Sequence, residues 1–259
     1  MSGYLRRVNL LGAGTFALFM VLWEVVVRLD LLGAEYLPGP TGVAVGLREI
    51  IVSGELRTSL THTLTAALAG WGLAAVVGVC AGMVLGLLRP VWKYSMASVE
   101  ALRALPIVAF VPVAVLLLGF TMKMEIAVSF VAALWPIVLN TFAGMRAVEI
   151  RTVEVGYVLR LPRLAQIWKL RLPAATSYII VGLRLGLTLS LILTLVAEMV
   201  GNPAGLGFAL IQTGQALQPE QMFAYVFVIG VCGILLNACL VSVARLVFRG
   251  QMLAAGDTA

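Results

Sequence analysis

The sequence predicts an all-α membrane protein with six transmembrane helices, and three observations carry that prediction. Only 12% of the 259 residues are charged and 61% are hydrophobic, whereas a soluble domain carries about 25% charged residues. Six apolar runs reach the length of about 20 residues that a helix needs to cross a bilayer, and they are continuous rather than alternating. Basic residues gather in alternate loops between them. The runs occupy residues 10–27, 64–88, 104–122, 126–145, 174–200 and 222–243.

The distribution of basic residues predicts the topology. Most of the eighteen Lys and Arg fall on one side of the membrane when the N-terminus is placed in the cytoplasm. Because cytoplasmic loops of multi-pass proteins carry an excess of Lys and Arg, we expect both termini to be cytoplasmic. The formal charge of +6 then reflects topology and contact with lipid, not a nucleic-acid partner. We expect a single transmembrane domain over residues 1–259.

The first run could be read as a signal peptide, because basic residues precede its apolar core. It is longer than a usual signal core, it contains Glu24, and no small-x-small cleavage site follows. We therefore interpret it as a retained span. A short helix should follow along the outer membrane surface, capped by Thr41, running through Ser53 and ended by Gly54.

Small residues and prolines mark the inner runs. Glycines four residues apart form a ridge on the second run and a shorter one on the fifth, and such ridges allow close helix contact. Packing inside one subunit is favoured over a dimer seam, which stays open. Prolines in the third and fourth runs should make the backbone irregular. These residues are Gly78, Gly82, Gly86, Gly182, Gly186, Pro106, Pro112 and Pro136.

Residues that would support catalysis are nearly absent. No phosphate-binding G-x-x-x-x-G-K-[ST], no G-x-S-x-G and no H-E-x-x-H occurs in the sequence. His62 is the only histidine, and we interpret it as interfacial. The three cysteines lie in apolar runs at no metal-like spacing. We predict no enzyme, with no catalytic residue, no metal site and no cofactor on this chain.

Ionisable residues within the runs are Glu24, Arg184 and Glu198, and burying a charge in a bilayer is costly. Arg184 is either a pathway or gate residue, or an arginine paired to helix ends and carbonyls at a subunit seam. Glu198 lies at the outer end of its run, where water should reach it, and a structural or docking role is favoured over proton coupling. A hydroxyl-lined path for an anion would combine Arg184 with Asn140, Thr188 and Ser190.

The loop over residues 146–173 is basic and helical. Its apolar positions recur at helical spacing up to Leu161, and Pro162 suits the start of a second helix. That second helix would have Leu164, Ile167 and Trp168 on an apolar side, and Leu172-Pro173 would stop it. Composition alone is also typical of a segment resting on anionic lipid.

This loop resembles the coupling loop of permease subunits from binding-protein-dependent ABC importers. The family signature is E-A-A, then a turn glycine, then a closing L-P. Aligning the closing pair on Leu172-Pro173 puts the glutamate on Glu154, at the family spacing. The two alanines fall on Val155 and Gly156, and the turn glycine falls on Arg160. Either the turn is built differently, or the loop docks less tightly, or a second permease carries a better loop.

The resemblance extends over nearly the whole chain and points to the branch that imports nitrate, taurine, aliphatic sulfonates and bicarbonate. Short matches in the same order include L-P-G-P at 37–40, R-A-L-P at 103–106, G-L-R at 182–184, A-E at 197–198 and G-L-G at 205–207. They imply a type I importer-like fold and place Glu198, Gly205 and Gly207 at an external gate or docking site.

The resemblance also implies the partners and the location. Separate ATPase subunits would carry ATP and Mg and bind the loop through Glu154, Leu164, Ile167 and Trp168. A second permease copy, identical or related, and a periplasmic or extracellular solute-binding protein would complete the importer in a bacterial-type plasma membrane. Alternatives are an importer of this type for a pyrimidine vitamin precursor or an aromatic acid, or a secondary transporter without an ATPase.

Overall fold

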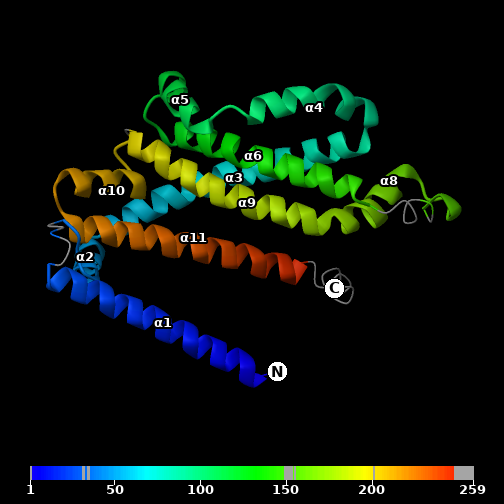
Figure 1. Cartoon of the computed structure of the whole chain (residues 1–259). Helices are drawn as coiled ribbons and strands as arrows, with labels where there is room; N and C mark the ends of the chain where they lie inside the picture. Colours follow the sequence, from blue (N-terminus) through cyan, green and yellow to red (C-terminus); the bar gives the residue numbers. More distant parts are fainter. Residues whose placement is uncertain are drawn as a thin grey trace. The chain divides into compact units, whose positions relative to one another are not determined.

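Figure 1 shows a computed structural model of the chain, in which the described residues form helices and turns and no strand. The structure describes residues 2–30, 33, 36–148, 154, 156–200 and 202–247. They fall into two compact units, Met1–Ser59 with Ala209–Gly230, and Leu60–Phe208 with Val231–Ala259. We refer to these as unit 1 and unit 2. The predicted all-α class is confirmed.

Within the described residues, five helices are long and apolar enough to cross a membrane, or up to six if one bent helix pair counts as a span. Five of the six predicted runs correspond to single helices. These are α1 (Ser2–Arg28), α3 (Glu55–Leu87), α6 (Met122–Arg146), α9 (Leu172–Val200) and α11 (Pro219–Val247). The third run differs, as shown below. The candidate spans are Leu11–Arg28, Glu55–Leu87, Met122–Arg146, Arg163–Val200 and Pro219–Leu246.

In unit 1, α1 (Ser2–Arg28) is followed by the short α2 (Pro40–Val52). The prediction that Thr41 caps α2 is wrong, because Gly39 occupies the cap position and Pro40 begins the helix. The Glu24 carboxylate accepts hydrogen bonds from the Thr41 N–H at 3.1 Å and the Thr41 hydroxyl at 2.7 Å. An acid from α1 therefore satisfies a donor in the first turn of α2. Gly54, at φ 80°, follows the end of α2.

The other elements of unit 1 come from the end of the chain. They are most of α10 (Leu206–Gln215) and the first part of α11 (Pro219–Val247). Gly46 of α2 lies against the backbone of Glu220 and Gln221, where a Cβ would not fit. The Gln221 side-chain amide also donates to the Glu49 carboxylate at 3.0 Å. Segments from opposite ends of the sequence thus pack together in this unit.

The core of unit 2 is a three-helix packing of α3 (Glu55–Leu87), α6 (Met122–Arg146) and α9 (Leu172–Val200). A Cβ built on Gly82 of α3 would lie 2.6 Å from the Thr141 Cβ of α6. The other ridge glycines of α3 and those of α9 make equally close approaches to α6. This confirms that the predicted ridges pack inside one subunit. The contacts pair Gly78 with Ile137, Gly86 with Met145, Gly182 with Asn140 and Gly186 with Ile137.

The third predicted run, residues 104–122, does not form one helix. Helix α4 (Arg89–Arg103) ends before it, and a short 3-10 turn, η1 (Ile107–Ala109), leads into α5 (Phe110–Leu118). The helix axis turns by 71° between α4 and the segment Ile107–Leu118, which comprises η1 and α5. Pro106 lies at the break, because proline lacks an N–H and disfavours helical geometry in the preceding residue. Pro112 lies in the first turn of α5, where proline is tolerated.

The end of the basic loop also differs from the prediction. Helix α8 (Arg163–Gln166) passes through a π-turn, η2 (Ile167–Arg171), directly into α9. Leu172-Pro173 therefore does not stop the helix. The wider π-turn, with the Leu172 N–H bonded to the Ile167 carbonyl, accommodates a proline that has no N–H of its own. Residues 149–153 and 155 of the first predicted loop helix lie outside the described residues.

Candidate functional site

Arg160 forms the turn between the two helical parts of the loop. Its φ is 50°, the left-handed conformation that favours glycine. The Arg160 N–H donates to the Tyr157 carbonyl and the Leu161 N–H donates to the Gly156 carbonyl, both at 3.0 Å. These two bonds make a Schellman motif, which satisfies carbonyls at a helix end. The turn keeps a left-handed geometry, and a non-glycine residue there costs about 1–2 kcal/mol.

Gly156 explains the second departure from the family signature. A Cβ at this position would lie 2.9 Å from the Leu170 Cδ1 and 3.2 Å from the Gln166 Cγ. The Gln166 amide is buried and donates to the Leu161 carbonyl at 2.9 Å. Helix α8 and η2 therefore fold back on the segment before the turn, and the close approach favours glycine over the family's alanine.

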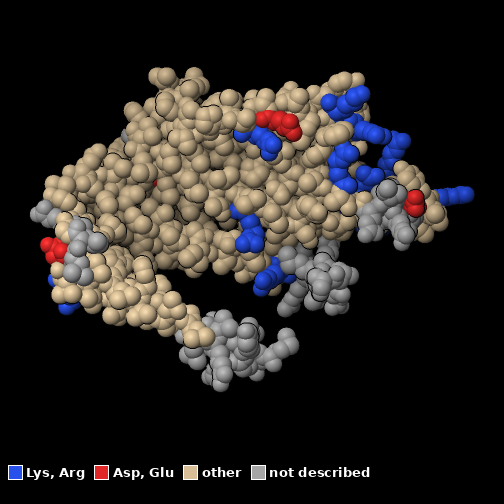
Figure 2. Space-filling model, viewed as in Figure 1, with Lys and Arg blue, Asp and Glu red and all other residues tan. Residues whose placement is uncertain are grey.

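The outer face of this loop presents apolar side chains among basic ones. Leu164 is 67% exposed and Trp168 is 60% exposed, while Ile167, Leu172 and Pro173 are partly buried. Glu154 is exposed beside the turn. We call Glu154, Leu164 and Trp168 the loop face. Figure 2 shows Lys and Arg gathered at the end of unit 2 that carries α8. The basic residues of α8 and η2 are Arg163, Lys169 and Arg171.

A second polar site lies at the end of α9 that is far from the loop. There the N-terminal parts of α3 and α6 meet the C-terminal end of α9. The Nε2 atom of His62 lies 2.9 Å and 3.1 Å from the two Glu125 carboxylate oxygens. The Asn202 amide donates to Glu125 and lies 3.5 Å from His62 Nε2. Glu125 and Glu198 are both fully buried. One nitrogen or oxygen atom from each of His62, Glu125 and Glu198 lies within 4.8 Å of the other two. We call His62, Glu125, Glu198 and Asn202 the polar cluster.

Glu198 is held by donors from two other segments. The Thr63 hydroxyl donates to one Glu198 oxygen at 2.7 Å, and the Gly207 N–H donates to the other at 2.8 Å. The Leu206 N–H donates in turn to the Thr63 oxygen at 2.8 Å. Gly205 has a φ of 95°, and a Cβ there would collide with the Glu198 carboxylate. A Cβ on Gly207 would collide with the Leu195 carbonyl, so both glycines are required next to Glu198 for steric reasons.

One sequence expectation at this site is corrected. Glu198 is not in contact with water in this chain, because the turn at 202–207 covers it and its exposure is 0%. His62, predicted to be interfacial, also pairs with Glu125 of α6, 63 residues away in the sequence. Glu125 was missed, since it lies one residue before the fourth apolar run. An acid directly before an apolar run, in the first turn of its helix, was the available signal.

The four predicted pathway residues do not come together. Arg184 Nε donates to the Asn237 side-chain oxygen on α11 at 3.0 Å, and Thr188 donates to the Arg184 carbonyl at 3.2 Å. Both side chains are exposed in the single chain. Ser190 is instead buried and donates to the Ala67 carbonyl of α3 at 2.7 Å.

Asn140 is also separate from Arg184. Its amide donates to the Pro136 carbonyl at 2.8 Å, and its Cβ lies against Gly182. Residues two apart on a helix point in nearly opposite directions, so Gly182 and Arg184 occupy different faces of α9. Of the four predicted pathway residues, Arg184 and Thr188 therefore share one exposed face. Asn237 lies beside Arg184, and the sequence did not indicate it.

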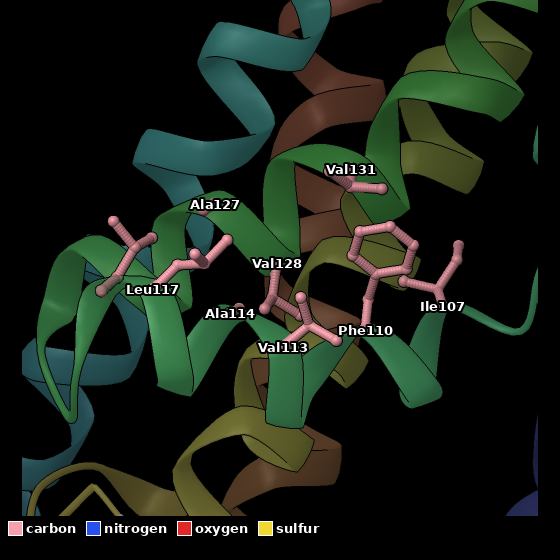
Figure 3. A pocket seen from close by; sticks show the side chains of 9 residues that line it. Ile107, Phe110, Val113, Ala114, Leu117, Ala127, Val128 and Val131 are labelled. Carbon is pink, nitrogen blue, oxygen red and sulfur yellow. The ribbon is translucent and has the colours of Figure 1, made fainter.

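An apolar pocket of about 180 Å³ lies between η1, α5 and α6. Figure 3 shows the side chains that line it, among them Phe110, Val128 and Val131. All nine lining residues are hydrophobic. This pocket offers no hydrogen-bond donor or charge to an anion, so the polar groups of Arg184 and of the polar cluster are the better candidates for solute chemistry.

Comparison with known proteins identifies several transport permeases as relatives of this chain. A family model described as binding-protein-dependent transport system inner membrane component matches residues 74–251. The aliphatic sulfonates transport permease protein SsuC of Bacillus subtilis (strain 168) is 32% identical over 217 residues, covering 84% of this chain and 79% of SsuC. The taurine transport system permease protein TauC of Escherichia coli (strain K12) is 27% identical over 238 residues, covering 90% of this chain and 86% of TauC.

The nitrate import permease protein NrtB of Synechococcus elongatus is 27% identical over 243 residues, covering 89% of this chain and 86% of NrtB. Among solved structures, an inward-facing form of the MetNI methionine ABC transporter matches with a TM-score of 0.64 at 17% identity. That match covers 74% of this chain and 95% of the other chain. At this identity the likeness supports the fold alone.

Proposed function

Because the chain belongs to the family of binding-protein-dependent transport system inner membrane components, we propose that it lines the solute pathway of an ABC importer in a bacterial plasma membrane. Two permease chains, identical or related, form that pathway. Separate ATPase subunits supply ATP and Mg, and an external binding protein delivers the solute. The chain itself performs no covalent chemistry; it alternates between inward-open and outward-open states.

The loop face is the proposed contact with the ATPase, and its exposed Trp168 is the observation that carries the assignment. A large apolar side chain that is 60% exposed among basic residues suits a partner groove with an acidic rim. Glu154 would contact or orient the same partner. Since α8, η2 and α9 follow one another without a break from Arg163 to Val200, closure of the ATPases would move the far end of α9 through one helical lever.

The test is Trp168→Ala and, separately, Glu154→Lys in the assembled importer. Both variants should reach the membrane but lose most of the solute-stimulated ATP hydrolysis and uptake, because the lever is no longer driven. Tyr94→Ala is the matched control, since Tyr94 is another exposed aromatic residue, 78% exposed, on α4. Normal hydrolysis and uptake in both loop variants would refute the coupling role.

The solute is proposed to be a small anion of the class that the relatives' names describe, such as a sulfonate, taurine, nitrate or bicarbonate. Arg184 supports this, because it is a permanent cation on an exposed face of α9, positioned by Asn237 at 3.0 Å. Uptake of these anions by Arg184→Gln should fall at least tenfold, and Arg184→Lys should keep part of it. Unchanged anion uptake in Arg184→Gln, at normal expression, would exclude this role.

Glu198, Gly205 and Gly207 are proposed to form part of the external gate. The support is that buried hydrogen bonds hold the turn at 202–207 to α3 through Thr63, to α6 through Glu125 and to α9 through Glu198. In this role the network would release and re-form as the lever moves. A cysteine cross-link between Thr63 and Leu206, adjacent in this network, should block uptake reversibly; uptake that continues through the cross-link would reject the gate.

A further inference from the structure

We infer that the polar cluster binds one first-row divalent cation, of the Zn²⁺ class, through His62, Glu125 and Glu198. These residues come from three different helices, and their ligand-type atoms all lie within 4.8 Å of one another. Zn²⁺ takes imidazole nitrogen at about 2.0–2.1 Å and carboxylate oxygen at about 2.0–2.2 Å, which places tetrahedral ligands about 3.4 Å apart. Small side-chain adjustments would therefore bring the three atoms to a common ion.

The charges of the cluster favour a cation. Glu125 and Glu198 are both fully buried, and a carboxylate oxygen of each lies within 4.8 Å of the other. Two buried carboxylates this close need protons, a cationic partner or a metal ion to offset their repulsion. A divalent cation would neutralise both, and a neutral His62 would serve as the nitrogen ligand.

The surrounding hydrogen bonds resemble the outer shell that orients metal ligands. Thr63 and the Gly207 N–H each donate to a different oxygen of Glu198, and the Asn202 amide donates to Glu125. Each carboxylate oxygen can accept more than one contact, so these donors leave capacity for an ion. Partners of this kind fix ligand orientation, and their loss typically lowers metal affinity about 10–100-fold.

The ligand types select the ion. One imidazole with two carboxylates suits Zn²⁺, Mn²⁺ or Co²⁺, whereas Ca²⁺ and Mg²⁺ prefer oxygen ligands alone and in larger number. The site was invisible as a sequence motif, because His62 and Glu125 are 63 residues apart. Such an ion would be a regulatory ligand rather than a cofactor of transport.

The consequence for transport rests on the proposed function. A cation bridging α3, α6 and α9 would clamp the helix ends beneath the 202–207 turn, which is the proposed external gate. Micromolar Zn²⁺ would then slow uptake by holding the gate in one state. Glu125→Gln should remove this inhibition.

Binding is tested on the purified full-length chain in detergent by titrating Zn²⁺ against a chromophoric chelator. One Zn²⁺ per chain is expected, with affinity reduced at least tenfold in His62→Gln and in Glu125→Gln. Glu24→Gln is the matched control, because Glu24 is a hydrogen-bonded acid of another helix, and it should bind as the unmodified chain does. Thr63→Val, which removes a donor to Glu198 but no proposed ligand, should weaken binding by about 10–100-fold.

A second measurement needs no variant. X-ray absorption of the Zn²⁺-loaded chain should show one nitrogen from histidine, with oxygen as the remaining donors, near 2.0–2.2 Å. Absence of stoichiometric Zn²⁺, sulfur ligands in the spectrum, or equal affinity in Glu125→Gln would overturn the site. Because the titration uses the isolated chain, it can fail while Trp168→Ala still uncouples transport, so the two proposals are separable.

Discussion

Thr63 and Glu198 are 135 residues apart and fully buried, yet their side chains share a 2.7 Å hydrogen bond. The same Thr63 oxygen accepts the Leu206 N–H at 2.8 Å. One hydroxyl therefore connects α3, the end of α9 and the start of α10.

Replacing Thr63 by valine should destabilise the protein by about 1–3 kcal/mol, because the buried Glu198 carboxylate loses one of its two donors and the buried Leu206 N–H loses its acceptor. Thermal unfolding in detergent measures the loss as a lower Tm. Thr65→Val is the control: its exposed hydroxyl bonds only the Thr61 carbonyl of its own helix. A Tm drop of the same size in both variants would mean that the loss of a hydroxyl, not the Glu198 contact, is responsible.

Gly205→Ala should destabilise the protein more than Gly54→Ala does. Both glycines have positive φ, 95° and 80°, so both substitutions carry a backbone cost of about 1–2 kcal/mol. Only at Gly205 would the Cβ also strike the Glu198 carboxylate, whereas nothing lies within 4 Å at Gly54. Comparing the yields and Tm values of the two variants isolates the steric term, and equal losses would contradict the close packing at Gly205.

Gly82→Ala should destabilise the packing of α3 on α6, because its Cβ would lie 2.6 Å from Thr141 and 2.7 Å from the Val138 carbonyl. Overpacking of this kind typically costs about 1–3 kcal/mol. Gly72, on the same helix, has nothing within 4 Å, so Gly72→Ala should be neutral or stabilise by up to about 1 kcal/mol. Denaturation curves of the two variants should move in opposite directions or differ clearly in size.

Arg160→Gly should stabilise the loop turn by about 1 kcal/mol, because glycine adopts φ 50° without the steric penalty of a side chain. Ala165→Gly, within α8, should instead destabilise by up to about 1 kcal/mol, because glycine is less favourable than alanine in a helix. Limited proteolysis of the loop measures both changes. Faster cleavage of Arg160→Gly than of the unmodified chain would show that the arginine side chain itself holds the turn.

The helices of this protein were largely predictable because a membrane span is encoded locally. A long apolar run such as residues 126–145 has to satisfy its backbone internally, and only a helix does so within lipid. The glycine ridge on α3 was equally readable, since its spacing depends on one helix alone. Helix ends were less predictable: Pro173 suggested a stop, but a π-turn accommodates it, and Pro106 divided a run that hydropathy treats as continuous.

The candidate sites were predictable to different degrees for the same reason. Exposed apolar positions such as Leu164 and Trp168 follow from the periodicity of one short segment, and the sequence indicated them. The left-handed turn at Arg160 was suggested only through the family pattern, because an arginine carries no local signal for positive φ. Its assignment needed the two backbone hydrogen bonds of the turn.

By itself, the sequence determined the all-α membrane class, the family and the presence of a second loop helix starting near Pro162, which in the structure is the cap residue before Arg163. Tertiary structure decided that the Ser190 hydroxyl donates to the Ala67 carbonyl, and that Asn140 and Arg184 belong to different faces. It also decided that His62, Glu125 and Glu198 meet. The physical reason is that hydropathy and helical period depend on neighbours along the chain, whereas a buried polar group finds its partner only when separate helices pack.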